Sequence, residues 1–186
     1  MFETGVIHGR FQVLHNDHIT YLMAGRQRCR HLVVGITNPD PNLTGEDPAD
    51  PGRSLPAANP LTYYERYRMV QAALLEKGLA VTDFSLVPLP INFPDLYRYY
   101  VPLDAVFFLT IYDSWGKKKL ERFRSLGLRT EVLWERPLQE KGLSAAGIRR
   151  MIIDGDPWEH LVPPSTAQML KQWDLPARLR QIAASE

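Results

Sequence analysis

Short runs of β-forming residues alternate with longer helical patterns, and this alternation restricts the folds open to the chain more than any other feature. The runs typical of strands are Gly5–His8, His31–Thr37, Phe84–Leu89, Ala105–Ile111 and Thr130–Trp134. The segments typical of helices are His18–Cys29, Leu61–Lys77, Trp115–Leu126 and Ser144–Asp154. Strands that alternate with helices favour a parallel sheet covered on both faces. We therefore expect an α/β fold built on a doubly wound parallel sheet.

Two of the predicted helices carry end signals of their own. The helix at 61–77 presents one apolar face, whose residues recur at steps of four, three and four: Tyr63, Tyr67, Val70 and Leu74. Gly78 follows it and is suited to a helix C-cap. The helix near residue 150 has Ser144 as an expected N-cap and Gly155 just beyond its end. These signals predict the end of the first of these helices and both ends of the second.

The segment 38–60 interrupts this alternation. It holds six prolines and four acidic residues, a proline density at which no regular element is expected. A solvated surface insertion loop is the simpler interpretation, and a lid over a binding site is the alternative. No further strand is predicted after residue 156, so 156–186 should form a short helical tail with a break at 162–164. No linker divides the chain, and we expect residues 1–186 to form one domain.

Composition and charge exclude several classes of partner. Apolar residues make up 45% of the 186 residues, charged residues 23%, and the formal net charge is +1. Bulk charge therefore gives no reason to expect binding to nucleic acid or to an anionic membrane, and any anion site must be local. The single cysteine, Cys29, fits a reducing compartment. With no signal peptide or transmembrane run visible, we expect a cytoplasmic protein.

The first predicted strand runs into the segment HGRFQVLHNDH, residues 8–18. Ligands of doubly wound sheets bind beyond the carboxyl ends of the strands, and a helix start offers unpaired N–H groups and a positive dipole end. Gly9 lets the backbone approach a ligand closely. Arg10 can bind phosphate oxygens with its forked guanidinium, and His15 and His18 can donate to them. These residues together predict a phosphate site.

Three simpler interpretations of the same segment stay open. The His-x-x-His spacing can be half of a metal site, although no further cluster of Cys, His or carboxylate with ligand spacing is visible, so no protein-bound metal is expected. The histidines can be surface residues at a helix start, with Asn16 or Asp17 as N-cap. Gly9 can serve only a turn.

A second motif lies near the other end, in KGLSAAGIRRMI at 141–152. Together with GRFQVLHNDH it resembles the HIGH-type nucleotidyltransferase superfamily, and the chain is most similar to the archaeal-type nicotinamide-mononucleotide adenylyltransferases. Three more segments are similar to motifs of that family in the same order: NPLTYYER at 59–66, INFPDLY at 91–97 and GDPWEHLVPP at 155–164. The resemblance implies a Rossmann-like nucleotidyltransferase fold that transfers a nucleotidyl group from a nucleoside triphosphate.

The resemblance also implies roles for individual residues. His15, His18 and Arg149 would be catalytic and would stabilise the phosphates in the transition state. The nucleotide would be bound by Gly9, Arg10, Phe11, Gln12, Ser144, Ile148 and Arg149, and the acceptor by Arg66, Phe93 and Tyr97. Mg²⁺ would be held through the substrate phosphates rather than by a protein cage. As alternatives, Tyr97 can be a core residue and Arg66 a surface partner on its helix, while Trp158 is expected to pack the tail.

The implied reaction is transfer of AMP from ATP to nicotinamide mononucleotide or a related mononucleotide, which forms a dinucleotide such as NAD and releases pyrophosphate. The sequence departs from the family where Asp17 replaces a glycine and Ala146 a threonine. These departures motivate the alternatives: a cytidylyl- or adenylyltransferase acting on a different phosphorylated or phosphonylated acceptor, or an inactive nucleotide-binding homologue. We expect Asp17 to cap the first helix and to point away from the phosphates. The expected partners are small-molecule nucleotides and, because the family often forms multimers, a second copy of the chain in a homo-oligomer.

Overall fold

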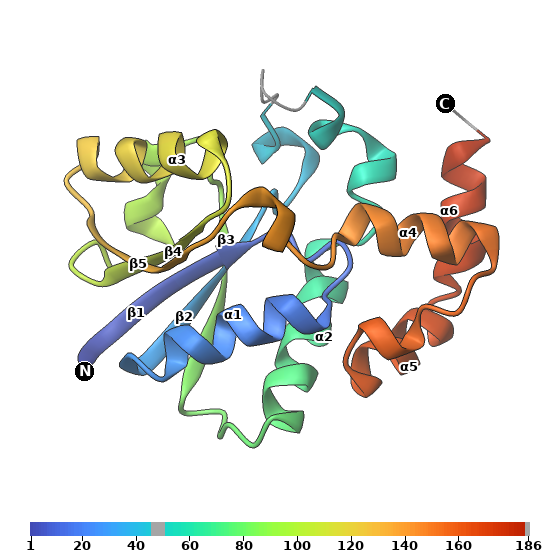
Figure 1. The fold of residues 1–186 in the computed structure, drawn as a ribbon, viewed down its shortest axis with the longest axis horizontal. Coiled ribbons are helices and arrows are strands. Elements are labelled where there is room, and N and C mark those ends of the chain that lie inside the picture. Colours follow the sequence, from blue (N-terminus) through green and yellow to red (C-terminus); the bar gives the residue numbers. More distant parts are fainter. Residues whose placement is uncertain (46–50, 185–186) are drawn as a thin grey trace.

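The computed structural model describes residues 1–45 and 51–184. Within them, five parallel strands form one sheet in the order β3-β2-β1-β4-β5 (Figure 1). The strands are β1 (Phe2–Gly9), β2 (Cys29–Thr37), β3 (Phe84–Leu89), β4 (Val106–Ile111) and β5 (Arg129–Glu135). The order reverses between β1 and β4, which makes this the topological switch point of the sheet. The expected doubly wound, Rossmann-like α/β fold is confirmed.

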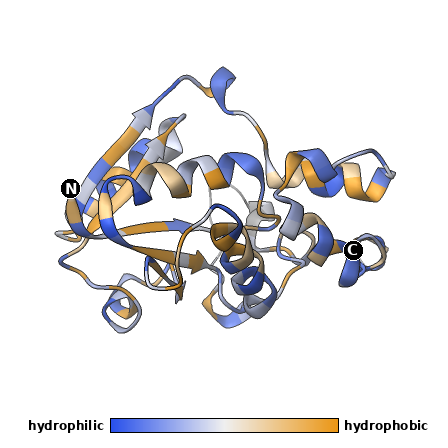
Figure 2. Cartoon of the chain, turned by 90° about the horizontal axis from the view of Figure 1, so that it is seen from below, coloured by the Kyte–Doolittle hydropathy of each residue, from blue (hydrophilic) through white to orange (hydrophobic). Residues whose placement is uncertain are grey.

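Helices cover both faces of the sheet. They are α1 (Asn16–Arg26), α2 (Tyr63–Glu76), α3 (Ser114–Ser125), α4 (Ala145–Asp154), α5 (Pro164–Gln172) and α6 (Leu175–Ala183). Because successive strand residues face opposite sides, Ile7 of β1 joins the core beneath α1, α2 and the C-terminal helices. Its neighbour Val6 joins a separate core beneath α3. Figure 2 shows the hydrophobic residues along the strands, between these helical layers.

The predicted strands are all present, and β3 has the predicted bounds. The first helix differs from its prediction at both ends, because α1 begins at Asn16 and ends at Arg26, while Cys29 is already the first residue of β2. The end signals of α4 are confirmed, since the Ser144 side chain accepts a hydrogen bond from Gly147 N and Gly155 adopts a left-handed φ of 81°. Gly78 likewise follows the end of α2 with a φ of 84°.

The proline-rich segment contains more regular structure than predicted. Short 3-10 helices form at Pro41–Leu43, Pro51–Ser54 and Pro56–Ala58, because proline fixes φ near the helical value at a first helical position. The part of the loop prediction that concerns 46–50 lies outside the described residues.

The tail is helical as predicted. A 3-10 turn (Glu159–Leu161) and the helices α5 and α6 follow residue 156, and α5 begins at Pro164, at the predicted break. Trp158 is 6% exposed and packs in the larger core, which confirms its predicted role. Two further 3-10 helices, Pro94–Tyr99 and Leu138–Glu140, lie after β3 and β5. In the described part of the chain, no helix has the length and apolar character needed to span a membrane.

Candidate active site at the ends of β1 and β4

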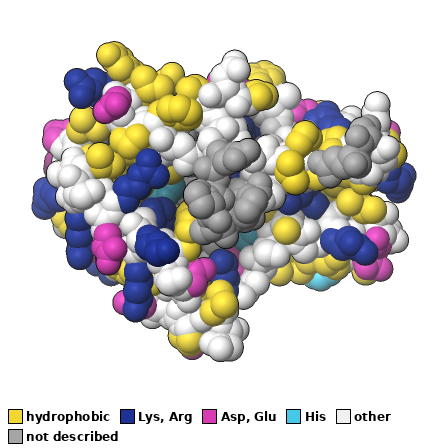
Figure 3. Space-filling model, turned by 90° about the horizontal axis from the view of Figure 1, so that it is seen from above, with side chains coloured by type: hydrophobic (Ala, Val, Ile, Leu, Met, Phe, Trp, Pro, Cys, Tyr) yellow, Lys and Arg dark blue, Asp and Glu magenta, His cyan; other side chains and the backbone are white. Residues whose placement is uncertain are grey.

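A cavity of about 430 Å³ lies at the switch point of the sheet. Its walls come from the end of β1, the end of β4, and the first turns of α1, α3 and α4, with Trp134 of β5 at one side. Because the unpaired N–H groups and positive dipole ends of these helices face one space, the cavity is suited to an anion. On the face drawn in Figure 3, lysine and arginine side chains gather around a histidine side chain.

His15 and His18 lie together at the start of α1, as the sequence predicts. Their rings stack with centroids 3.6 Å apart, and His15 is the N-cap residue of the helix. His18 Nδ1 accepts a hydrogen bond from His15 N at 3.3 Å, which assigns the proton of a neutral His18 ring to Nε2. Both imidazoles line the cavity. They can donate to an anion from this wall.

The pKa values of both imidazoles are lowered in the ligand-free site. Burial lowers the pKa of His15 to about 4, although the carboxylate of Asp17 opposes the shift. Burial also holds the pKa of His18 well below its usual value, and the nearby His15 and Arg10 lower it further. A bound polyanion would oppose this lowering, because its charge favours the protonated form of a nearby imidazole.

Cations other than the histidines also line the cavity. Arg10 follows β1, and Lys119 lies over the ring of Trp115, with Nζ 4.4 Å from the ring centroid. Lys141 is placed at the cavity by the segment that joins β5 to α4, and its Nζ lies 3.5 Å from Asp113 Oδ2. Positive side chains thus approach the cavity from several elements, as an anionic ligand requires.

The start of α4 lines the cavity through Ser144. Ile148 and Arg149, which the family resemblance also assigns to the nucleotide, do not line it. Ile148 is 1% exposed and belongs to the core. Arg149 is 9% exposed, and its Nη1 donates a hydrogen bond to the carbonyl oxygen of Gln12. Burial lowers its pKa. In the ligand-free structure the guanidinium thus binds the backbone of the β1–α1 loop and does not line the cavity, and its expected contact with phosphate stays a prediction.

Arg66 also differs from its predicted role. Its guanidinium is buried, with the residue 1% exposed, and its Nη atoms donate to three carbonyl oxygens, those of Arg10 at 3.0 Å, Thr37 at 2.6 Å and Asn38 at 2.7 Å. Burial lowers its pKa to about 10. Arg66 joins the ends of β1 and β2 and presents no guanidinium to the cavity. Its burial rules out the alternative of a surface partner on its helix, and its predicted contact with the acceptor stays a prediction.

Gln12 and Tyr97 are engaged inside the protein. The amide of Gln12 exchanges hydrogen bonds with the backbone of Leu61, donating to its oxygen at 2.8 Å and accepting from its nitrogen at 2.9 Å. Gln12 lines the cavity, but its side-chain amide is already paired. Tyr97 is 2% exposed and its hydroxyl donates to Ile91 O at 2.6 Å, so it is a core residue and not a stacking surface. Phe93 is 37% exposed and lies outside the cavity lining.

Gly9 and Phe11 both line the cavity, as predicted, and the Phe11 ring packs where a side chain at residue 9 would lie. A Cβ at residue 9 would lie 2.7 Å from the ring of Phe11, so the glycine makes room for that ring as well as for a ligand. Phe11 itself has a φ of 52°, unusual for a residue with a side chain. Its ring meets the edge of His18, with centroids 5.1 Å apart.

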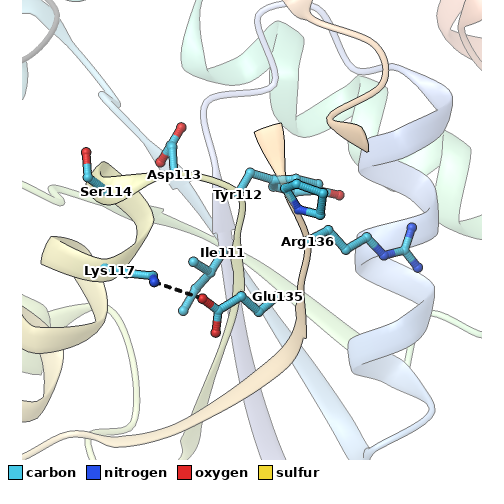
Figure 4. A pocket seen from close by; sticks show the side chains of 8 residues that line it. Ile111, Tyr112, Asp113, Ser114, Lys117, Glu135 and Arg136 are labelled. Carbon is cyan, nitrogen blue, oxygen red and sulfur yellow. Dashed lines mark ion pairs between the residues drawn. The ribbon is translucent and has the colours of Figure 1, made fainter. Parts of the chain in front are cut away.

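The sequence prediction missed an aromatic wall on the β4–β5 side of the cavity. Trp134 Nε1 donates to the hydroxyl of Tyr112 at 2.8 Å, and Tyr21 packs edge-on against Trp134. Figure 4 shows a neighbouring cavity, also about 430 Å³, in which the ion pair between Lys117 and Glu135 lies at 3.1 Å. Tyr112 lines both cavities. The aromatic wall was missed because the sequence does not indicate the strand order, which places the end of β4 beside that of β1.

Asp17 is not the helix cap that the sequence predicts. It is the second residue of α1, and its Oδ2 accepts a hydrogen bond from Leu143 N at 2.6 Å, in the segment before α4. Ala146 lines the cavity in the first turn of α4. In the described part of the chain, no group of three or more His, Cys, Asp or Glu gathers as metal ligands.

Comparison with known proteins agrees with this geometry. The chain is 54% identical over 177 residues to phosphonoformate cytidylyltransferase of Streptomyces viridochromogenes, covering 95% of each chain. It is 32% identical over 186 residues to the nicotinamide-nucleotide adenylyltransferase of Pyrococcus furiosus, covering 98% of this chain and 90% of that one. Both relatives carry nucleotidyltransferase names.

A solved structure supports the fold. The bifunctional NMN adenylyltransferase/ADP ribose pyrophosphatase of Francisella tularensis superposes with a TM-score of 0.72 at 14% identity, covering 99% of this chain. The chain spans about half of that bifunctional protein, 52% of its length. The cytidylyltransferase-like family model matches residues 6–151. With most of its length matched by that model, and with the pocket for an anion at its switch point, the chain belongs to the cytidylyltransferase-like family of nucleotidyltransferases.

Proposed function

We propose that the protein transfers a cytidylyl group from CTP to a phosphonate oxygen of a small phosphonocarboxylate such as phosphonoformate, and releases pyrophosphate. The observation that carries this proposal is the 54% identity, over 95% of both chains, to a phosphonoformate cytidylyltransferase. Identity to the nicotinamide-nucleotide adenylyltransferases is near 30%. The alternative that the sequence departures motivated is therefore preferred to adenylyl transfer onto nicotinamide mononucleotide.

The reaction needs alignment and charge stabilisation rather than a general base. The phosphonate oxygen is already anionic near pH 7 and attacks the α-phosphorus of CTP. The new phosphorus–oxygen bond forms as the bond from the α-phosphorus to the bridging oxygen breaks, and the electron pair leaves with pyrophosphate. Two anions must be held close together while charge moves onto the leaving group.

The cavity provides groups for this task. In the proposal, the triphosphate lies over the N-termini of α1 and α4, where His15, His18 and Ser144 line the cavity. The imidazoles donate hydrogen bonds to phosphate oxygens, and Arg10 and Lys141 add positive charge. The base then extends toward the aromatic wall of Tyr112 and Trp134, at the other side of the cavity. Each of these groups would stabilise negative charge on the phosphates or orient the nucleotide, and none would need to remove a proton.

The acceptor side supports a small acceptor. A mononucleotide would need a phosphate contact and a surface for its ring, roles that the family resemblance gave to Arg66 and Tyr97. Both side chains are buried and hydrogen-bonded within the protein. A phosphonocarboxylate has no ring to stack, so its binding requires neither residue.

Mg²⁺ enters this proposal together with the triphosphate. The carboxylates in the cavity lining, Asp17 and Asp113, each accept a backbone hydrogen bond, from Leu143 N and Gly116 N. Phosphate oxygens and water are therefore the expected ligands, as is usual for this ion. When bound, Mg²⁺ would neutralise phosphate charge.

Pyrophosphate release in a matched set of reactions tests the proposal. The enzyme is supplied with Mg²⁺ and each pairing of CTP or ATP with phosphonoformate or nicotinamide mononucleotide. We expect the fastest release with CTP and phosphonoformate, and a product whose mass equals CMP joined to phosphonoformate. Faster release with ATP and nicotinamide mononucleotide would overturn the proposal in favour of the adenylyl reaction. Binding of CTP without turnover of any pair would identify an inactive homologue.

A further inference from the structure

Asp17 and the segment 141–144 meet at the rim of the cavity, although they are far apart in the sequence. The carboxylate of Asp17 accepts from Leu143 N at 2.6 Å across 126 residues. Asp17 lies between the two imidazoles in the sequence, and Leu143 directly precedes Ser144, the N-cap of α4. The hydrogen bond thus joins the two helix starts that line the proposed phosphate site.

Gly142 is the structural complement of Asp17. A Cβ at residue 142 would lie 2.4 Å from Asp17 Oδ2, closer than atoms can approach. The φ of Gly142 is not in the left-handed region, so the backbone itself would accept a side chain. A side chain at residue 142 would therefore displace the carboxylate from its place against the glycine.

The segment that makes this contact carries residues that line the cavity. Lys141 lies one residue before Gly142 and is held on its other side by Asp113, 3.5 Å away. Ser144 caps α4 by accepting from Gly147 N at 3.1 Å. The segment is thus held from α1 and from the start of α3, and its cation and the N–H groups of α4 are directed into the cavity. A carboxylate beside a polyanion site is otherwise unfavourable, because like charges repel.

We infer that Asp17 is a positioning residue: its hydrogen bond to Leu143 N holds Lys141 and the N-terminus of α4 where they bind the nucleoside triphosphate. The inference rests on the proposed site for the triphosphate and not on the identity of the acceptor. It also revises the capping role expected from sequence, because the Asp17 carboxylate accepts a hydrogen bond from Leu143 N and not from the backbone of its own helix.

Titration calorimetry with CTP and Mg²⁺, without acceptor, tests the inference on the wild-type protein and four variants. Asp17→Ala removes the acceptor atom and should weaken CTP binding roughly tenfold, the value of one charge-assisted hydrogen bond. Asp17→Asn keeps an oxygen that can accept from Leu143 N and should stay within about threefold of the wild type. Gly142→Ala should weaken CTP binding as Asp17→Ala does, because the new Cβ displaces the carboxylate.

The double variant Asp17→Ala/Gly142→Ala should bind CTP no more weakly than either single variant, because both changes break one contact. Melting temperatures without nucleotide should fall by less than about 5 °C, since the hydrogen bond is exposed. The KM for phosphonoformate at saturating CTP should not change.

Unaltered or tighter CTP binding by Asp17→Ala would overturn the inference, as would additive losses in the double variant. A loss in Asp17→Asn equal to that in Asp17→Ala would also overturn it, because charge and not the hydrogen bond would then be responsible. If the wild-type protein binds no nucleoside triphosphate, the proposed function itself fails, and that result is distinct from equal binding by the wild type and all four variants.

Discussion

Replacing His15 by glutamine should remove a large part of the protein's sensitivity to mild acid. The pKa of His15 is lowered by burial from 6.5 to about 4 in the folded protein. Between these values the unfolded chain binds more protons than the folded chain, so the free energy of unfolding decreases as the pH falls through this window. Below about pH 4 both states are protonated and the decrease stops. With these two pKa values, the contribution of His15 is a loss of about 2 kcal/mol between pH 7.5 and pH 5.

Urea denaturation of the ligand-free protein at pH 7.5 and pH 5 measures this loss. The wild-type protein should lose about 2 kcal/mol more over this interval than His15→Gln does. His160→Gln is the matched control, because His160 is exposed, and it should keep the full wild-type loss. Equal losses in wild type and His15→Gln would refute the argument that burial keeps His15 neutral.

Other substitutions separate catalytic from structural roles. His18→Ala should reduce turnover by about 10²- to 10³-fold, the effect of losing one donor to developing charge, with the folded state confirmed by circular dichroism; near-normal turnover would remove this role. Arg149→Ala should lower the free energy of unfolding by roughly 2 kcal/mol in urea, because the carbonyl of Gln12 loses its buried charged donor. Arg66→Met should cost more, about 3 kcal/mol or above, since three carbonyl oxygens lose their donor. A normal denaturation midpoint with weakened substrate binding would restore the ligand roles first expected for these arginines.

The fold was predictable because its signals are local. Alternation of strand and helix composition depends on residues within each segment, and caps such as Ser144 and Gly155 act within one helical turn. The imidazole pair was predictable for the same reason, because a spacing of three places His15 and His18 on one helix start. Helix ends were less accurate where no cap residue marks them, as at Arg26.

The roles of the buried arginines were not predictable, because their partners are remote. Arg66 donates to the carbonyl of Arg10 across 56 residues, and Arg149 donates to that of Gln12 across 137. A sequence motif identifies a cation near a phosphate loop but does not indicate whether it faces the ligand or the loop behind it. The contact of Asp17 with Leu143 and the aromatic pair of Tyr112 and Trp134 likewise depend on which segments the sheet brings together.

The convergence of α1, α3 and α4 on one cavity has a consequence for how this enzyme can diversify. In the proposed site, much of the attraction for phosphate would come from main-chain N–H groups, which every non-proline residue supplies whatever its side chain. Substitutions at rim positions such as Tyr112, Trp134 or Ala146 can therefore alter the nucleobase or acceptor while the anion-binding framework persists. The proposed site thus separates the groups that would bind phosphate from those that would select the substrate, so libraries for directed evolution should be concentrated on those rim positions.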